Sequence, residues 1–241
     1  MGLDSAPMKG AIALVGSGEF TPALESIDRE LLAATGRARP RVAILPTASA
    51  PEGEDAFLRW AEMGRQHFSA LGAEVEPVLV RDRRAAQDPA NAQAIGEADL
   101  VYLSGGKSDF LYDALAGTAV ERAIHEAHAR GAVVAGCSAG AIVLADRRLR
   151  VRRRMPFPPS WQPAFGLVPQ AAVAPHYDAL PETLMLLLIL AAPRGSVVLG
   201  IDEETVMVGR DGTWQVQGRG RVTVWRGRRR TRHRDGETFR F

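Results

Sequence analysis

The fold is decided by residues 132–141, which read Ala-Val-Val-Ala-Gly-Cys-Ser-Ala-Gly-Ala. An apolar, β-branched run leads here into the pattern Gly-x-Ser-x-Gly and then into helix-forming residues, which predicts a strand, a sharp turn and a helix. Such a turn needs residues without a Cβ on both sides, and Gly136 and Gly140 supply them. The turn would expose the Ser138 hydroxyl at the carboxyl end of a sheet, so Ser138 is the candidate nucleophile of a nucleophile elbow. The alternative is that Ser138 only caps the helix that begins at Ala139.

A serine hydroxyl needs a base to become a nucleophile, and the sequence offers five histidines. His176 follows a strand-like apolar run, residues 168–174, and stands where a helix-forming segment begins. Because α/β enzymes keep their chemistry at such strand ends, we expect His176 to be the base. The alternative is a loop histidine held by a backbone carbonyl. His125 and His128 share one face of a predicted helix but have no third ligand, so no metal site is predicted.

The carboxylate that would orient the imidazole must lie downstream, because residues 147–177 contain neither Asp nor Glu. The strand-like residues 196–201 are followed by Asp-Glu-Glu at residues 202–204. Carboxylates at a break between buried strands need partners, although for the first and last of these three we prefer an ordinary acidic turn. The order Ser, His, acid differs from that of α/β-hydrolases and argues against a lipase or esterase.

Six segments spread over nearly the whole chain carry a family resemblance. They are Val15-Gly16-Ser17-Gly18-Glu19-Phe20, Ile44-Leu45-Pro46-Thr47-Ala48-Ser49, Leu103-Ser104-Gly105-Gly106, Gly136-Cys137-Ser138-Ala139-Gly140-Ala141, Pro175-His176-Tyr177 and Gly200-Ile201-Asp202-Glu203. In this order they resemble the dipeptidase E and cyanophycinase family of serine peptidases, whose fold is related to the class I glutamine amidotransferase domain.

The resemblance implies a Ser-His-Glu triad, with Ser138 as nucleophile, His176 as general base and acid, and Glu203 holding the imidazole in its tautomer. The residues alone require a carboxylate, but they do not choose Glu203 over its neighbours. The implied activity is hydrolysis of a short peptide or peptide-like amide through an acyl-enzyme, without a cofactor. The alternative from another class is a non-catalytic small-ligand-binding protein on an amidotransferase-like fold.

Backbone N–H groups are expected to form the oxyanion hole, since preorganised donors stabilise a tetrahedral oxyanion best. Ala139 supplies one donor at the start of the elbow helix, and Gly106 supplies the other, with Gly105 shaping the turn. The alternative is that the two glycines only make a strand-to-helix turn.

The resemblance implies cleavage next to aspartate. Enzymes of this family tend to carry polar or basic residues in the helix after the histidine. Residues 183–192 contain no arginine here, so a different source of cations is needed. Six arginines form an unopposed basic run in a segment expected to be irregular: Arg147, Arg148, Arg150, Arg152, Arg153 and Arg154. Because arginine binds carboxylates bidentately, we expect an aspartyl or other acidic peptide as substrate. The candidate substrate-binding residues are Lys107, Arg147, Arg148, Arg150 and Tyr177. The alternative for the basic run is a solvated loop.

The alternation of strand-like and helix-like segments predicts an α/β fold with a mostly parallel sheet and helices on both faces, in one peptidase domain over residues 1–241. The expected parallel strands lie near residues 11–15, 41–45, 74–79, 100–103 and 132–135. From Gly166 onward, short strands should extend this sheet or pack beside it as an antiparallel edge, with a hairpin turn at Asp211-Gly212.

Composition limits the compartment and the partners. The single cysteine, Cys137, excludes an internal disulfide, suits a reducing compartment and is interpreted as a packed residue. The first ten residues lack the pattern of a signal peptide, so a cytoplasmic location is expected. The most apolar window, residues 184–192, is too short to span a bilayer and is expected to be a buried helix.

The basic residues are clustered, but the net charge is only +2. Nearly all of them are arginines, the lysines being Lys9 and Lys107, which indicates a compositional bias and argues against a nucleic-acid partner. We therefore expect a small peptide as partner and no membrane, with the oligomeric state, a homo-oligomer included, left open.

Overall fold

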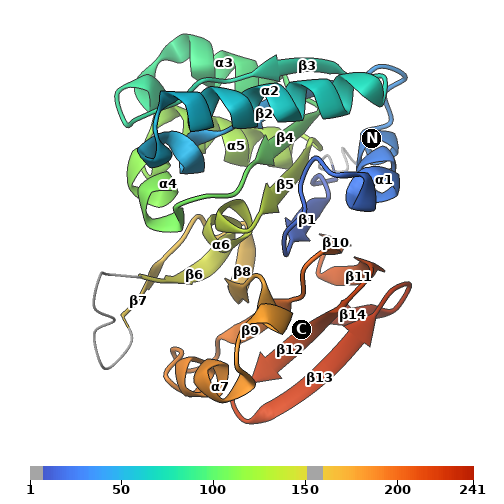
Figure 1. Ribbon diagram of the computed structural model, residues 1–241, viewed down its shortest axis with the longest axis vertical. Helices are drawn as coiled ribbons and strands as arrows, with labels where there is room; N and C mark the ends of the chain where they lie inside the picture. The colour runs from blue at the N-terminus through green and yellow to red at the C-terminus, as the bar shows by residue number, and fades with distance from the viewer. Residues whose placement is uncertain (1–7, 151–159) are drawn as a thin grey trace, which may run out of the picture.

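The computed structural model describes residues 8–150 and 160–241, which form two sheets that share an apolar core (Figure 1). The first sheet has eight strands in the order β14-β11-β10-β1-β5-β4-β2-β3. Five of them are parallel: β1 (Ile12–Val15), β2 (Arg41–Leu45), β3 (Glu74–Pro77), β4 (Leu100–Leu103) and β5 (Val133–Cys137). Each lies within about two residues of its predicted position, because runs of buried apolar residues are typical of parallel strands covered on both faces.

Helices cover both faces of the parallel strands, as predicted. One face packs against α1 (Glu25–Ala34) and α2 (Glu54–Ala70). The other face packs against α3 (Pro89–Glu97), α4 (Ser108–Leu115), α5 (Ala119–Ala129) and α6 (Ala139–Leu144). Short 3₁₀ helices occupy Pro22–Leu24, Thr47–Glu52, Ala85–Gln87 and Tyr177–Ala179. Because β1, β4 and β5 are neighbouring parallel strands, their carboxyl ends meet at one edge of the sheet.

The C-terminal strands divide between the two arrangements that the sequence left open. Strands β10 (Thr205–Arg210), β11 (Thr213–Gly218) and β14 (Thr238–Arg240) extend the first sheet as its antiparallel edge, with the predicted hairpin turn between β10 and β11. The second sheet, in the order β13-β12-β9-β8-β6-β7, contains β6 (Ala145–Leu149), β7 (Trp161–Pro163), β8 (Val168–Ala174), β9 (Val197–Ile201), β12 (Arg221–Arg226) and β13 (Arg229–Arg234). Because β6, β8 and β9 run parallel, their carboxyl ends also share one edge.

The start of the basic run is a strand, and the expectation of an irregular segment there was wrong. Strand β6 begins at Ala145, directly after α6, and includes Arg147 and Arg148. Ala145 and Asp146 belong to residue types that are depleted in strands. Pairing with β7 on one side and β8 on the other fixes its conformation, and a single sequence does not reveal such long-range pairing.

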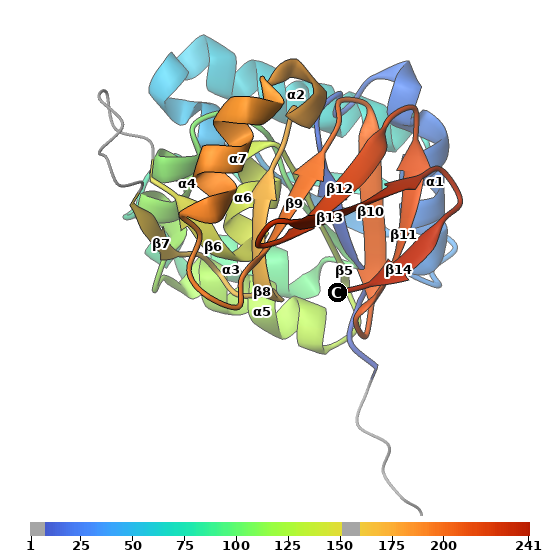
Figure 2. The same cartoon turned by 90° about the horizontal axis from the view of Figure 1, so that it is seen from below.

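Helix α7 (Glu182–Leu190) is only half covered, although its apolar sequence predicted a buried helix. Met185 and Ile189 are buried against β8, β9 and the Trp225 ring, and Figure 2 shows α7 next to β9. Leu187 and Leu190 are 64% and 44% exposed. No helix in the described part of the chain is both long enough and apolar enough to cross a bilayer.

Replacing Gly200 in β9 tests how tightly the second sheet packs under the 3₁₀ turn that follows β8. A Cβ on Gly200 would come within 2.4 Å of Tyr177 Cδ2, so Gly200→Ala should lower the free energy of unfolding by about 1–3 kcal/mol through overpacking. Gly96 in α3 is the matched control, because no atom lies within 4 Å of its added Cβ. Gly96→Ala should be neutral or stabilise the protein by up to about 1 kcal/mol. Urea denaturation followed by circular dichroism measures both variants, and equal midpoints would contradict the packing.

Candidate active site

Ser138 stands between β5 and α6 in a strained backbone conformation, with φ +49° and ψ −103°. Such a conformation persists only where the surrounding structure imposes it. A Cβ on Gly136 would lie 2.5 Å from the carbonyl carbon of Gly140, and a Cβ on Gly140 would lie 2.2 Å from Leu103 O. The two glycines of the Gly-x-Ser-x-Gly pattern are therefore required by close packing of backbone against backbone.

The structure brings Ser138, His176 and Glu203 into one hydrogen-bonded chain. Ser138 Oγ lies 3.0 Å from His176 Nε2, and His176 Nδ1 lies 2.8 Å from Glu203 Oε1. His176 follows the carboxyl end of β8 with φ +51° and ψ +39°, and Glu203 follows the carboxyl end of β9. Strands β8 and β9 belong to the second sheet and β5 to the first (Figure 1). The histidine and the glutamate thus follow strands of the second sheet, and the serine follows a strand of the first.

The three consecutive acidic residues after β9 face three different partners. Glu203 faces the imidazole, whereas Asp202 Oδ2 accepts the Arg221 N–H at 3.1 Å and Glu204 Oε2 lies 3.2 Å from Arg219 Nη1. Burial raises the pKa of Asp202, and the charge of Asp178 raises it further. Their different partners distinguish the three carboxyl groups, which the sequence alone could not do.

Two further side chains reach the backbone of the site, and sequence reasoning gave neither a role. Asp178 Oδ1 accepts the Glu203 N–H at 2.9 Å. Glu19, only 7% exposed, accepts the Gly105 N–H at 2.8 Å through Oε1 and a hydrogen bond from Cys137 Sγ at 2.8 Å through Oε2. The available signals were the position of Asp178 two residues after the histidine and the place of Glu19 in the first segment of the family resemblance.

Cys137 is buried beneath the turn that carries the serine. Burial raises the pKa of its thiol well above the ordinary value, and the neighbouring charge of Glu19 raises it further. A protonated thiol is a weak nucleophile, which agrees with the interpretation of Cys137 as a packed residue.

The glycine pair after β4 lies directly beside the serine. A Cβ on Gly105 would come 3.4 Å from Ser138 Cβ and 2.7 Å from Glu19 Oε1. Gly106 has φ +137°, and a Cβ there would lie 2.4 Å from Ala48 O. Any other residue at either position would displace the strand end from the serine, so the pair does more than turn the chain into α4.

Arg148 is engaged by acidic residues, so the prediction of an unopposed basic run was wrong here. It is 3% exposed, pairs with Asp109, and places Nη2 3.9 Å from Asp113 Oδ1. Its guanidinium carbon also lies 4.0 Å from the centre of the Tyr112 ring. Both acidic partners lie on α4, so Arg148 braces that helix against β6.

The other described arginines of the run are paired as well. Arg147 Nε lies 3.3 Å from Asp146 Oδ2, and Arg150 Nη2 lies 3.8 Å from Asp113 Oδ2. Arg152, Arg153 and Arg154 lie outside the described residues. The run looked unopposed because two of its three acidic partners, Asp109 and Asp113, belong to an earlier part of the sequence.

The remaining two candidates for substrate binding lie in different environments. Lys107 is exposed and directly follows Gly106 at the start of α4. Tyr177 is buried, and its hydroxyl oxygen accepts a hydrogen bond from Trp225 Nε1 at 2.9 Å. Lys107 is therefore accessible beside the site, whereas the Tyr177 ring belongs to the core between β9 and α7.

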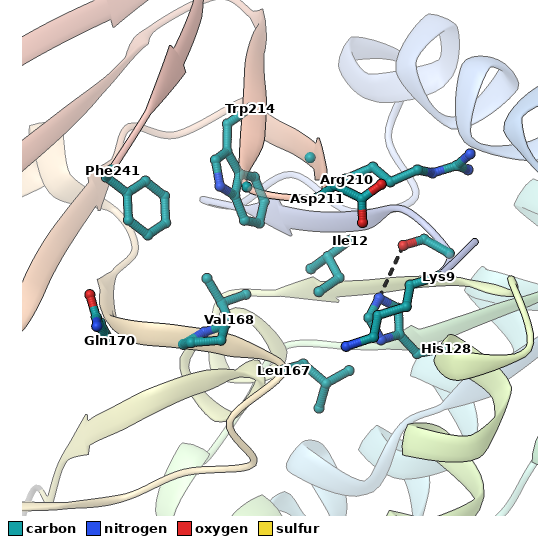
Figure 3. A pocket seen from close by; sticks show the side chains of 14 residues that line it. Lys9, Ile12, His128, Leu167, Val168, Gln170, Arg210, Asp211, Trp214 and Phe241 are labelled. Atoms are coloured by element: carbon teal, nitrogen blue, oxygen red, sulfur yellow. Dashed lines mark hydrogen bonds between the residues drawn. The ribbon is translucent and has the colours of Figure 1, made fainter. Parts of the chain in front are cut away.

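A cavity of about 470 Å³ lies at the other end of the first sheet (Figure 3). Its lining includes Lys9 before β1, His128 at the end of α5 and Trp214 in β11. His128 Nε2 lies 3.0 Å from Gly10 O, and burial lowers the pKa of this histidine. Ligand sites of α/β sheets occur at the carboxyl ends of the strands, and this cavity lies at the amino end of β1. This cavity is therefore separate from the serine site.

Comparison with known proteins places this geometry in a family. The chain matches peptidase family S51 over residues 12–217. The chain belongs to that family. A crystal structure of a peptidase from an acI-B1 actinobacterium is 32% identical, with a TM-score of 0.88 and coverage of 98% of both chains. A candidate peptidase E protein from Listeria monocytogenes, 19% identical with a TM-score of 0.65 over 88% of this chain and 100% of that one, shares the fold.

The curated relatives include several cyanophycinases. Those of Trichormus variabilis and Nostoc sp. are 28% identical over 225 residues, covering 90% of this chain and 73% of theirs. That of Synechococcus elongatus is 28% identical over 172 residues, covering 67% of this chain and 53% of its own length.

These matches confirm the resemblance to the dipeptidase E and cyanophycinase family, and with it the class of the protein. This S51 protein is a hydrolase, a serine peptidase, which sets aside the alternative of a non-catalytic binding protein. The mostly parallel sheet with helices on both faces and antiparallel C-terminal strands is confirmed as its fold class.

Glu19 should stabilise the turn beside the serine through its hydrogen bond to Gly105. Glu19→Ala removes the acceptor of a buried N–H group, which should cost about 1–3 kcal/mol of unfolding free energy. Glu19→Gln keeps an acceptor in the same place and should cost less. Chemical denaturation of the two variants measures the difference, and an alanine variant as stable as the glutamine variant would show that this hydrogen bond contributes little.

Proposed function

We propose that this S51 peptidase hydrolyses a short peptide or peptide-like amide through an acyl-enzyme, with Ser138 as nucleophile, His176 as general base and acid, and Glu203 as the acid that orients the imidazole. The observation that carries the proposal is the chain of two hydrogen bonds, 3.0 Å and 2.8 Å long, through the two ring nitrogens of His176. Nucleophile, base and orienting acid within hydrogen-bond reach are the geometric signature of a catalytic triad.

The first step is attack on the scissile carbonyl. With its Nδ1–H donated to Glu203, His176 keeps Nε2 free to accept the hydroxyl proton of Ser138 as Oγ forms a bond to the carbonyl carbon. The carboxylate also stabilises the imidazolium that results. Asp178 supports this arrangement indirectly, because it accepts the Glu203 N–H and so fixes the backbone that carries the acid.

The carbonyl oxygen becomes an oxyanion, for which we propose the N–H groups of Gly106 and Ala139 as donors. The first N–H groups of a helix have no intrahelical acceptor, and Ala139 opens α6. The Gly105 N–H is already taken by Glu19, which leaves Gly106 as the donor from the turn after β4. The hydrogen bonds among the described residues include no acceptor for Gly106 or Ala139. Donors fixed in this way need no reorganisation during the reaction.

The second half of the reaction returns the enzyme to its starting state. The imidazolium gives its Nε2 proton to the leaving amine as the carbon–nitrogen bond breaks, and an acyl group stays on Ser138 Oγ. Water then attacks the ester, with His176 again accepting a proton at Nε2 and returning it to Ser138. The products are an acid and an amine, and no cofactor takes part.

The proposal extends to the class of substrate, the cellular location and the domain that carries the activity. Lys107 is exposed beside Gly106, so it would attract a carboxylate of an aspartyl or other acidic peptide, or the terminal carboxylate of a short one. We propose a small peptide as the partner. The single buried cysteine suits a reducing compartment, so we propose a cytoplasmic location. We assign the activity to one domain over residues 1–241.

Substitutions in the triad should separate catalysis from folding. Ser138→Ala and His176→Ala should each reduce kcat to near background, and the double variant should lose little more because the two residues act as a unit. Glu203→Gln should retain more activity than either. Glu204→Gln, which removes the charge paired with the exposed Arg219, is the matched control and should keep wild-type kcat/KM. Equal losses in the Glu203 and Glu204 variants would contradict the assignment of the acid.

The neighbouring thiol needs its own control. Cys137→Ala should retain most of the activity, because burial keeps the thiol protonated and away from substrate. Steady-state kinetics of Cys137→Ala and Ser138→Ala on the same peptide compare the two candidates directly. Activity that survives in the serine variant but not in the cysteine variant would make Cys137 the nucleophile.

A further inference from the structure

A pocket of about 150 Å³ is lined by residues that lie close in the chain to the serine and the histidine. Pro175, which precedes His176, lines one side of it. Ile142 lines another side and lies one helical turn after Ser138, to whose carbonyl it donates its N–H at 3.0 Å. Ser108, at the start of α4, completes the edge nearest the glycine pair. Residues that lie close in the chain to the serine, the histidine and the glycine pair therefore line this pocket, which places it near the proposed site of the scissile bond.

The walls of the pocket are apolar and come from both layers of the molecule. Helices α6 and α7 and strands β6 and β7 supply the side chains of Ile142, Leu149, Trp161, Met185, Leu188 and Ile189. None of the described residues that line it carries a charge. An apolar cavity of about 150 Å³ in another protein holds a benzene molecule, so this one has room for a leucine or phenylalanine side chain.

The charges around the pocket do not favour an acidic side chain inside it. Arg148 and Arg150, the described cations on and just after β6, are engaged by Asp109 and Asp113 on α4. Among the described residues that line the pocket, a carboxylate would find no cation to replace its hydration, which is costly. An apolar side chain loses nothing of this kind and gains the hydrophobic contribution of burial.

We infer that this pocket is the specificity pocket of the peptidase and takes an apolar side chain, of leucine or phenylalanine size, from the substrate residue beside the scissile bond. The inference rests on the proposed function, since Ser138 must be the nucleophile for the pocket to flank the reacting bond. Lys107 lies outside the pocket and serves a carboxylate elsewhere on the peptide.

Trp161 provides a direct probe of occupancy. It lines the pocket, and its Nε1–H has no hydrogen-bond acceptor among the described residues. A bound peptide would offer a carbonyl oxygen to this donor and would also change the environment of the ring.

The kinetic test compares peptides of equal length that carry Leu, Phe, Ala, Asp or Lys beside the cleaved bond, varied on each side of that bond in turn. On one side, kcat/KM for Leu and Phe should exceed that for Ala and Asp by at least about tenfold, the discrimination typical of an apolar pocket. Equal values for Leu and Asp on both sides would overturn the specificity pocket.

Two neighbouring leucines of α7 make a matched pair of variants. Leu188 lines the pocket, whereas Leu187 is exposed and does not. Leu188→Arg should lower kcat/KM for the Leu peptide about tenfold and raise it for the Asp peptide, and Leu187→Arg should change neither. Leu149→Arg, on the β6 wall of the pocket, repeats the test if the first variant folds poorly. Identical effects of Leu187→Arg and Leu188→Arg would also overturn the inference.

A binding measurement makes the result independent of turnover. In the Ser138→Ala protein, N-acetyl-leucinamide should shift the indole N–H resonance of Trp161, assigned with Trp161→Phe, and the corresponding aspartyl compound should not. Loss of turnover in Ser138→Ala with no discrimination and no shift would remove the pocket and leave the proposed function standing. Full activity in Ser138→Ala would remove the proposed function, and the specificity pocket with it.

Discussion

The close packing of α6 on the first sheet is the constraint on which the rest of the structure depends. A Cβ on Gly140 would stand 2.2 Å from Leu103 O, so the helix can lie at this depth only with glycine there. The helix has six residues and runs straight from β5 into β6, which makes it the link between the two sheets. Its depth therefore fixes the serine that precedes it and also the position from which the second sheet starts. A helix displaced by one side chain would move the serine relative to His176, which the second sheet carries.

Backbone strain gathers around the same place. Ser138, His176 and Glu204 are among the described non-glycine residues with positive φ, and so is Phe20, which follows the buried Glu19. Each such residue costs on the order of 1–3 kcal/mol and persists only where well-packed neighbours impose it. Here the neighbours are buried strands of two sheets with a common core. Of these residues, Ser138 and His176 bring their side chains together at 3.0 Å, whereas Glu204 faces Arg219.

The sequence predicted the elements better than it predicted their partners. Gly-x-Ser-x-Gly after an apolar run located the turn, because both signals are local, and the parallel strands were found for the same reason. Strand β6 of the second sheet was not anticipated, since it reads as charged and is a strand only through its pairing with β7 and β8. Long-range partners also explain part of the basic run, because Arg148 and Arg150 meet Asp109 and Asp113 of α4. Glu203 could be chosen over its neighbours only through the family resemblance, because what distinguishes it is an imidazole 27 residues away.

The two sheets supply different groups to the candidate site. The first sheet supplies the serine and the glycine turn, whose positions depend on backbone contacts that tolerate almost no substitution. The second sheet and α7 supply the histidine and acid on one side and side chains such as Leu149 and Leu188 on the other. Neither side chain takes part in the hydrogen bonds of the proposed triad, so we expect changes in them to alter the pocket without moving the proposed nucleophile. Peptidases built on this fold can therefore differ in substrate while keeping the same reacting groups, and differences in specificity should be sought in α7 and β6 before the strand ends of the first sheet.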